Sequence, residues 1–181
     1  NASGVQVDYI GNVLKYDPDQ FSLRMENVAD IHELMSEPTG NHTLNVIGYV
    51  PGTNFGGGQF YWNASKPKSQ HNGITIFSPT VPWDGSYAGL AAFLAGTGET
   101  DGSGSGCWIR VNSPLDAIHT EWAGHDVNGV NDSTASVNAC INKTAQGGNH
   151  NRLIFFIGYA VPFIFTGQHL YTGLVLVNQC T

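Results

Sequence analysis

Acidic side chains are the first candidates for chemistry in this chain, because pairs of carboxylates carry out glycoside hydrolysis. Glu99 and Asp101 stand two residues apart in a segment rich in Gly, Ser and Thr. They have no aromatic neighbours to stack a sugar ring, and they lack the alternating acidic ligands of a calcium loop. We therefore interpret them as carboxylates that solvate a loop.

A second group of potentially reactive side chains lies within one short segment. It consists of His119, Glu121, His125 and Asp126. Zinc sites use such ligands, but this spacing matches no metal-binding motif. We expect an ordinary hydrogen-bonded loop here and predict no metal ligand.

Two further patterns have a simpler structural explanation. Asp84 beside Trp83, with Tyr87 nearby, suits a carbohydrate contact, but turn chemistry at residues 82–85 explains the same residues. The run Gly56–Gly58 suggests a phosphate loop, yet it has no Lys-Ser/Thr partner and no following helix. A tight strand start with unusual backbone angles or a close approach explains it better. No nucleophile signature is present, so we predict no catalytic and no cofactor-binding residue.

The cysteines Cys107, Cys140 and Cys180 are odd in number and far apart. No Cys-x-x-Cys pair is present, which argues against a disulfide framework and against a zinc site. We expect buried free thiols in a reducing cytosol.

The composition favours turn-rich β structure in one sizeable domain or two small ones. Of 181 residues only 12% are charged, whereas 41% are hydrophobic and 23 are Gly. The net charge of −7 makes nucleic acid a poor partner. No apolar run reaches the roughly 20 residues of a membrane helix, so no membrane contact is predicted. The chain does not open with a secretory signal pattern.

The first forty residues predict a strand, a turn and a helix. Val5, Val7 and Tyr9 alternate as in a strand, and a turn follows at residues 17–19. Ser22 is a plausible N-cap for a helix over residues 22–35, whose apolar stripe is Val28, Ile31 and Leu34. The sequence leaves open whether this stripe packs on its own domain or on copies of itself around a symmetry axis.

Residues 44–112 predict a small, mostly β module. Strands are expected at residues 46–50, 59–62, 74–77 and 108–111, with a helix at Tyr87–Ala95. Residues 96–106 are expected to form a flexible, nearly structureless connector.

Residues 118–181 predict a helix followed by repeated strands. Asn131 or Asp132 can cap a helix that runs to about Ala145, with Val137, Cys140 and Ile141 on one face. Strands are expected at residues 153–157, 161–165 and 173–177. Stacked β units need about three or more copies to bury their faces, so we expect the polypeptide to continue past Thr181.

Three segments resemble one family in the same order. The segment Val7–Gln20, VDYIGNVLKYDPDQ, looks like the end of the head-binding domain and its linker in tailspikes of the short-tailed lambdoid phages of Salmonella and related enterics. Residues 46–49, 56–62, 72–76 and 108–110 are similar to a small module that often precedes the tailspike β-helix. Residues 126–134, DVNGVNDST, resemble the segment that leads into right-handed β-helices, with Asn131 and Ser133 where Thr and Asp are usual.

The resemblance implies a homotrimer that attaches to the phage tail and portal machinery through an upstream domain. It implies binding of bacterial surface polysaccharide, often with cleavage, by the β-helix downstream. No catalytic residue of the family matches a position here. The implied localisation is the virion tail, after assembly in the host cytoplasm.

These observations predict a mainly β fold with short helices, arranged in four parts. Residues 1–20 would end the head-binding domain, 21–40 form a helical neck, 41–113 form the β module, and 114–181 form the lead-in helix and first coils of a right-handed parallel β-helix. We expect a structural adaptor of a tailspike. The alternatives are part of a polysaccharide depolymerase with residual glycan binding, or a docking platform for another tail protein.

Overall fold

A computed structural model of the chain describes residues 26–37, 39–40, 43–111 and 117–145, and the backbone of three two-residue strands. These strands are β1 at Gln6–Val7, β2 at Val13–Leu14 and β9 at Leu153–Ile154. β1 and β2 pair antiparallel. The described part is mainly β with short helices, as the sequence predicts.

The centre of the fold is a five-stranded mixed sheet. Its strands are β3 at Glu26–Val28, β4 at Thr43–Gly48, β5 at Gly56–Pro67, β6 at Ile76–Phe77 and β7 at Ser105–Arg110. Their order is β3-β4-β5-β7-β6, in which only β3 and β4 run parallel. The period of two places Leu44, Val46 and Phe60 on the buried face and Thr43, Ile47 and Tyr61 on the exposed face.

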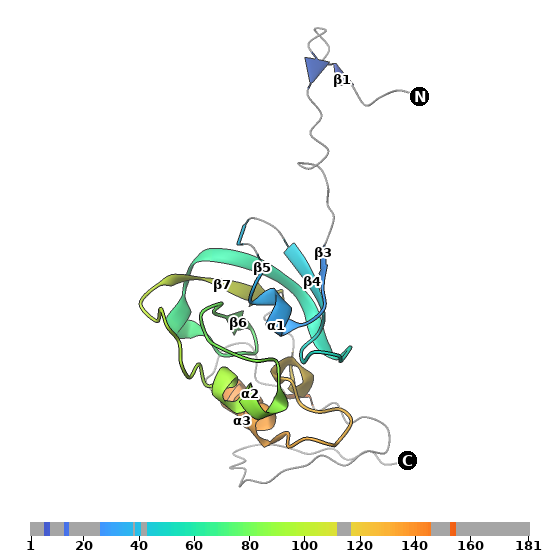
Figure 1. Cartoon of the computed structure of the whole chain (residues 1–181), viewed down its shortest axis with the longest axis vertical. Helices are drawn as coiled ribbons and strands as arrows, with labels where there is room; N and C mark the ends of the chain where they lie inside the picture. The colour runs from blue at the N-terminus through green and yellow to red at the C-terminus, as the bar shows by residue number, and fades with distance from the viewer. Residues whose placement is uncertain are drawn as a thin grey trace.

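Three helices complete the core. They are α1 at Ile31–Leu34, α2 at Tyr87–Leu94 and α3 at Thr134–Ala145. Figure 1 shows α2 and α3 next to each other at one end of the curved sheet, and the two helices are in contact. One continuous cluster of buried residues runs from Val28 in the first strand of the sheet to Cys140 in α3.

The predicted helix over residues 22–35 is wrong in the part that the structure describes. Val28 lies in β3, where it pairs with Val46, and the helix begins only at Ile31. Asp30 has an extended backbone and accepts a hydrogen bond from the Glu33 N–H, so it caps a one-turn helix. The predicted cap at Ser22 lies outside the described residues.

The apolar stripe of this helix packs on its own domain. Ile31 and Leu34 are fully buried in the core of the same chain. They are therefore not available to pack on copies of themselves around an axis. The sheet module begins at Glu26, and the expected helical neck over residues 21–40 becomes part of that module where it is described.

Two other helix predictions are confirmed. α2 occupies the range expected for it, and Ser86 caps it by accepting a hydrogen bond from the Gly89 N–H. α3 ends at Ala145 as expected. Its first helical hydrogen bond runs from the Val137 N–H to the Ser133 carbonyl, so the cap is Ser133 and the predicted cap at Asn131 or Asp132 is wrong by one or two residues. Asp132 instead accepts a hydrogen bond from the Thr134 N–H.

The segment after α3 continues into a parallel strand pair. β8 at Ile118–His119 pairs parallel with β9, in the register Ile118 to Leu153. The order β8, α3, β9 is a strand, helix, strand crossover. The strands predicted at residues 161–165 and 173–177 lie outside the described residues, as does the turn at residues 17–19. Within the part that is described, no helix has the length and apolarity to cross a bilayer.

Candidate functional site

The candidate site is the junction between the sheet and the segment 117–145. Arg110 lies at the centre of this junction. Arg110 ends β7 and is only 2% exposed. Its guanidinium lies between two aromatic rings, 4.6 Å from the centre of Phe60 and 5.0 Å from that of Trp122. Phe60 belongs to the sheet and Trp122 to the 3-10 turn η2 at Thr120–Ala123. The cation therefore joins the two parts directly.

Backbone carbonyls take the place of water around this cation. The Nε of Arg110 donates to the Ile74 carbonyl at 2.9 Å, and one terminal nitrogen donates to the Gly56 carbonyl at 2.8 Å. The other terminal nitrogen donates to the Gly57 carbonyl. Burial lowers the pKa of Arg110 to about 10, so the side chain remains charged at neutral pH. A buried cation is tolerated here because each of its three nitrogens donates to a backbone carbonyl.

The glycine run at the start of β5 makes this close approach possible. Gly56 has a φ of +76°, and a Cβ on it would lie 1.9 Å from the carbonyl oxygen of Glu121. A Cβ on Gly57 would lie 2.2 Å from the carbonyl oxygen of Val46. The predicted reading of these glycines as a tight strand start with a close backbone approach is confirmed.

Each part next to the junction also has one buried side chain that is hydrogen-bonded within its own part, Tyr49 in the sheet module and Asp126 in the segment 117–145. The buried Tyr49 hydroxyl donates to the Gly73 carbonyl at 2.6 Å, and burial raises the pKa of this phenol. Asp126 accepts hydrogen bonds from the backbone N–H groups of Asn128, Val130 and Asn131 at 2.7 to 2.9 Å. Burial opposes ionisation of Asp126, but these hydrogen bonds outweigh it and lower its pKa. The carboxylate therefore closes the loop before α3.

The group His119, Glu121, His125 and Asp126 does not converge on one point. His119 Nδ1 is 4.0 Å from Glu121 Oε1, while His125 and Asp126 are buried in the loop that leads to α3. No cluster of three or more metal-ligating side chains occurs among the described residues. The loop expectation holds only for His125 and Asp126, because His119 belongs to β8 and Glu121 to the 3-10 turn η2.

Glu99 and Asp101 bind neighbouring parts of the fold. Asp101 forms an ion pair with Lys68 at 2.8 Å. Glu99 accepts hydrogen bonds from the Thr80 hydroxyl and, at 2.9 Å, from the Asp101 N–H. Burial raises the pKa of Glu99, but its hydrogen bonds outweigh this and lower it overall. The expectation that residues 96–106 form a structureless connector is therefore wrong, because these contacts tie the segment to residues 68–80.

The turn at residues 82–85 packs at the edge of the core, and its polar groups bind neighbouring residues. Trp83 donates its indole N–H to the Ser86 carbonyl and stacks on Phe93, with ring centres 4.8 Å apart. Asp84 accepts hydrogen bonds from the N–H and the hydroxyl of Ser86. The turn explanation holds for both residues. Tyr87 lies near Asp126, and burial raises the pKa of its phenol to about 12.

Two of the three cysteines are described, and both are buried free thiols. Burial raises the pKa of Cys107 to about 11 and raises that of Cys140 further. The expectation of buried thiols is confirmed for this pair, and Cys180 lies outside the described residues. Neither is a reactive thiolate at neutral pH.

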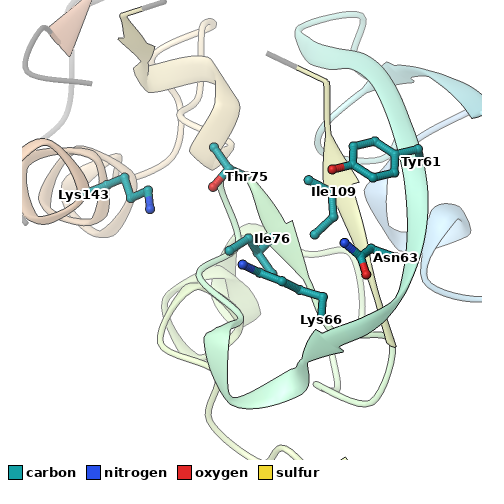
Figure 2. A pocket seen from close by; sticks show the side chains of 7 residues that line it. All are labelled: Tyr61, Asn63, Lys66, Thr75, Ile76, Ile109 and Lys143. Atoms are coloured by element: carbon teal, nitrogen blue, oxygen red, sulfur yellow. The ribbon is translucent and has the colours of Figure 1, made fainter. Parts of the chain in front are cut away.

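Sequence reasoning missed a groove on the exposed side of the sheet (Figure 2). It has a volume of about 200 Å³. Its lining residues are Tyr61, Asn63, Lys66, Thr75, Ile76, Ile109 and Lys143. No local pattern marks it, because Lys66 and Lys143 are 77 positions apart in the chain and line the same groove only in the folded structure.

One family model matches part of the chain. Residues 26–113 match the family model described as the phage tail protein small four-stranded beta-sheet domain. This range coincides with the sheet module, from β3 to just beyond β7. No curated protein matches the chain.

Several solved structures are similar to this chain at low identity. WceF of Pantoea stewartii, a glycan biofilm modifying enzyme with a tailspike-like parallel β-helix fold, is 20% identical with a TM-score of 0.47, over 77% of this chain and 17% of its own. Tailspike protein 2 of bacteriophage CBA120, in its enzymatically active domain, is 20% identical with a TM-score of 0.45, over 72% and 15%. Tailspike gp49 of Acinetobacter baumannii bacteriophage Fri1, a capsular polysaccharide depolymerase, is 19% identical with a TM-score of 0.47, over 67% and 18%. The chain spans less than a fifth of each of these proteins.

Proposed function

We propose that this chain is the structural adaptor of a bacteriophage tailspike of the short-tailed lambdoid group. In this role it joins an upstream virion-attachment domain to a downstream right-handed parallel β-helix that binds bacterial surface polysaccharide. The observation that carries the proposal is the continuous buried core. It extends from the phage tail β domain at residues 26–113 into the segment 117–140.

A shared core suits an adaptor because it transmits force without a hinge. Domains joined by a linker move relative to one another unless a large apolar interface holds them. Here Arg110 lies between a ring of the sheet and a ring of η2, and a Cβ at Gly56 would collide with η2. The sheet and α3 therefore behave as one body in this proposal.

The parallel pair β8 and β9 supports a parallel β trunk after α3. Parallel strands connected through a helix have an almost invariant right-handed crossover. β9 pairs with β8 on one side, and a strand has a second edge on which a further parallel strand can add.

The oligomeric part of the proposal is a homotrimer in the virion tail, assembled in the host cytoplasm and attached to the tail and portal machinery. Light scattering on the purified 181-residue protein tests whether this segment forms the trimer. The proposal predicts a mass of three chains at micromolar concentration. A stable monomer would contradict a trimer formed by this segment.

The second candidate is an enzymatic part of a polysaccharide depolymerase. The described carboxylates Glu99, Asp101 and Asp126 are engaged in local contacts, which favours a structural role. We therefore expect no oligosaccharide release when this chain is incubated with host lipopolysaccharide or capsule. Release that disappears on Glu99→Gln or Asp101→Asn would establish the enzymatic alternative.

A further inference from the structure

The groove of Figure 2 has a chemical character that the adaptor role does not require. Tyr61, Ile109 and Ile76 lie in register on three neighbouring strands and form an apolar row across the exposed face of the sheet. Tyr61 is 40% exposed. Around this row lie the amide of Asn63, the hydroxyl of Thr75 and two lysines.

The distribution of positive charge in the described part is uneven. Lys68 is paired with Asp101, and Arg110 is buried on backbone carbonyls. Lys66 and Lys143 form no ion pair among the described residues, and both line this groove. Figure 2 shows their amines directed into the same open space, Lys66 from β5 and Lys143 from α3. In a chain of net charge −7, these two amines make the groove locally positive.

We infer that this groove binds an anionic sugar, a pyranose that carries a carboxylate. A pyranose presents an apolar face of C–H groups, which fits the row of Tyr61, Ile109 and Ile76. Its hydroxyl groups match the side-chain NH2 group of Asn63, and its carboxylate matches the two ammonium groups. The Thr75 hydroxyl is buried and bonded to Asn72, so it lines the groove without serving the ligand. Pockets that bind small ligands combine an apolar floor with a few polar groups in this way.

The size of the groove favours a sugar unit over a protein surface. Its volume of about 200 Å³ lies below the roughly 300–1,000 Å³ of pockets for drug-sized ligands, so it accommodates about one ring. A stable protein interface buries about 800 Å² on each partner. A second hollow of about 370 Å³ shares Lys143 with this groove and is lined mostly by Ala, Leu and Ile side chains, and it adds no lysine or arginine other than Lys143.

This site is independent of the adaptor role, since an adaptor without it would still join two domains. Failure to bind sugar would overturn the site alone, and a monomeric chain would count against the trimeric adaptor alone.

The test is an NMR titration of the ¹⁵N-labelled full chain with trigalacturonate, with maltotriose and acetate as the neutral sugar and the ring-free carboxylate. We expect trigalacturonate to shift the amides of Tyr61, Asn63 and Ile109 with a Kd on the order of 1 mM. Maltotriose and acetate should bind at least about threefold more weakly. Lys66→Gln and Lys143→Gln should each weaken binding roughly three- to tenfold. Asn54→Asp makes the same change in net charge at the other end of β5 and should leave binding unchanged.

Three results would overturn the inference. The first is the absence of shifts at the groove with trigalacturonate. The second is equal binding of maltotriose with no effect of the lysine substitutions. The third is groove shifts that follow protein concentration in the absence of sugar, which would assign the groove to contact with a second copy of the chain. Retained dispersion of the amide spectrum in each variant confirms that the fold is intact.

Discussion

Replacement of Arg110 by Met tests the physical basis of the junction. Met approximates the length of the side chain but removes its charge and its donors. The carbonyls of Ile74, Gly56 and Gly57 would then lose their partners in a buried site. A hydrogen bond to a charged group contributes about 1.5–3 kcal/mol. The three together would exceed 4 kcal/mol, but release of the buried charge offsets part of this loss.

We therefore expect Arg110→Met to lower the free energy of unfolding by about 3–5 kcal/mol, because three buried carbonyls lose their donors at about 1–3 kcal/mol each and the relieved desolvation of the cation returns part of that loss. Arg110→Lys keeps the charge but cannot reach three carbonyls at once, so we expect a loss of about 2–3 kcal/mol. Equilibrium urea unfolding followed by tryptophan fluorescence measures both, since Trp122 contacts the guanidinium. Lys66→Met is the matched control on the neighbouring strand β5 and should change stability by less than about 0.5 kcal/mol.

A stability of Arg110→Met within about 1 kcal/mol of the parent would refute this reasoning. It would mean that desolvation of the cation cancels its hydrogen bonds, as happens when some buried ion pairs are replaced by apolar residues. Equal losses of unfolding free energy in Arg110→Met and Lys66→Met would also refute it. The loss of one positive charge, wherever it lies, would then explain both results.

Further predictions concern backbone space, pH and thiols. Gly56→Ala should cost about 3 kcal/mol or more by urea unfolding, whereas Gly52→Ala, with a similar φ but no atom within 4 Å of its Cβ, should cost only about 1–2 kcal/mol; equal costs would refute the close approach. Burial lowers the pKa of His71 from 6.5, so the unfolded chain takes up the proton first as the pH falls. Stability from His71 is therefore complete above about pH 6.5 and falls by up to about 1.4 kcal/mol per pH unit below it. His71→Gln should reduce that slope between pH 6.5 and 5, and an unchanged slope would contradict the assignment. Cys107 and Cys140 should resist alkylation in the native protein and react after denaturation, as read by peptide mass spectrometry; rapid native labelling would contradict their burial.

Capping residues and stop signals in the sequence predicted the helices whose formation depends on nearby residues. The helices at Tyr87–Leu94 and Thr134–Ala145 have capping residues and stop signals in their own sequence, and both form where expected. The glycine run also indicated a close backbone approach, because only Gly fits there. The prediction over residues 22–35 failed, because tertiary pairing of Val28 with Val46 prevailed over a helical stripe. A three-residue strand whose partner lies some eighteen positions away leaves no periodic signal.

The candidate sites also divide into those that depend on nearby residues and those that depend on tertiary packing. Asp84 and Asp126 serve turns and loops, which local turn chemistry predicts. The buried cation of Arg110 depends on carbonyls from two distant segments, so its role is invisible in the sequence. The groove lined by Lys66 and Lys143 likewise exists only in the folded structure.

The central claim is that the five-stranded sheet and the segment through α3 form one rigid body. Native-state hydrogen exchange across a series of urea concentrations tests it most directly. We predict that the slowest amides of β5, β7 and α3 open with free energies that agree within about 1 kcal/mol and converge on global unfolding. If the amides of α3 exchanged through an opening whose free energy is several kcal/mol lower, while β5 and β7 remained protected, the junction would be a hinge. That result would contradict the account.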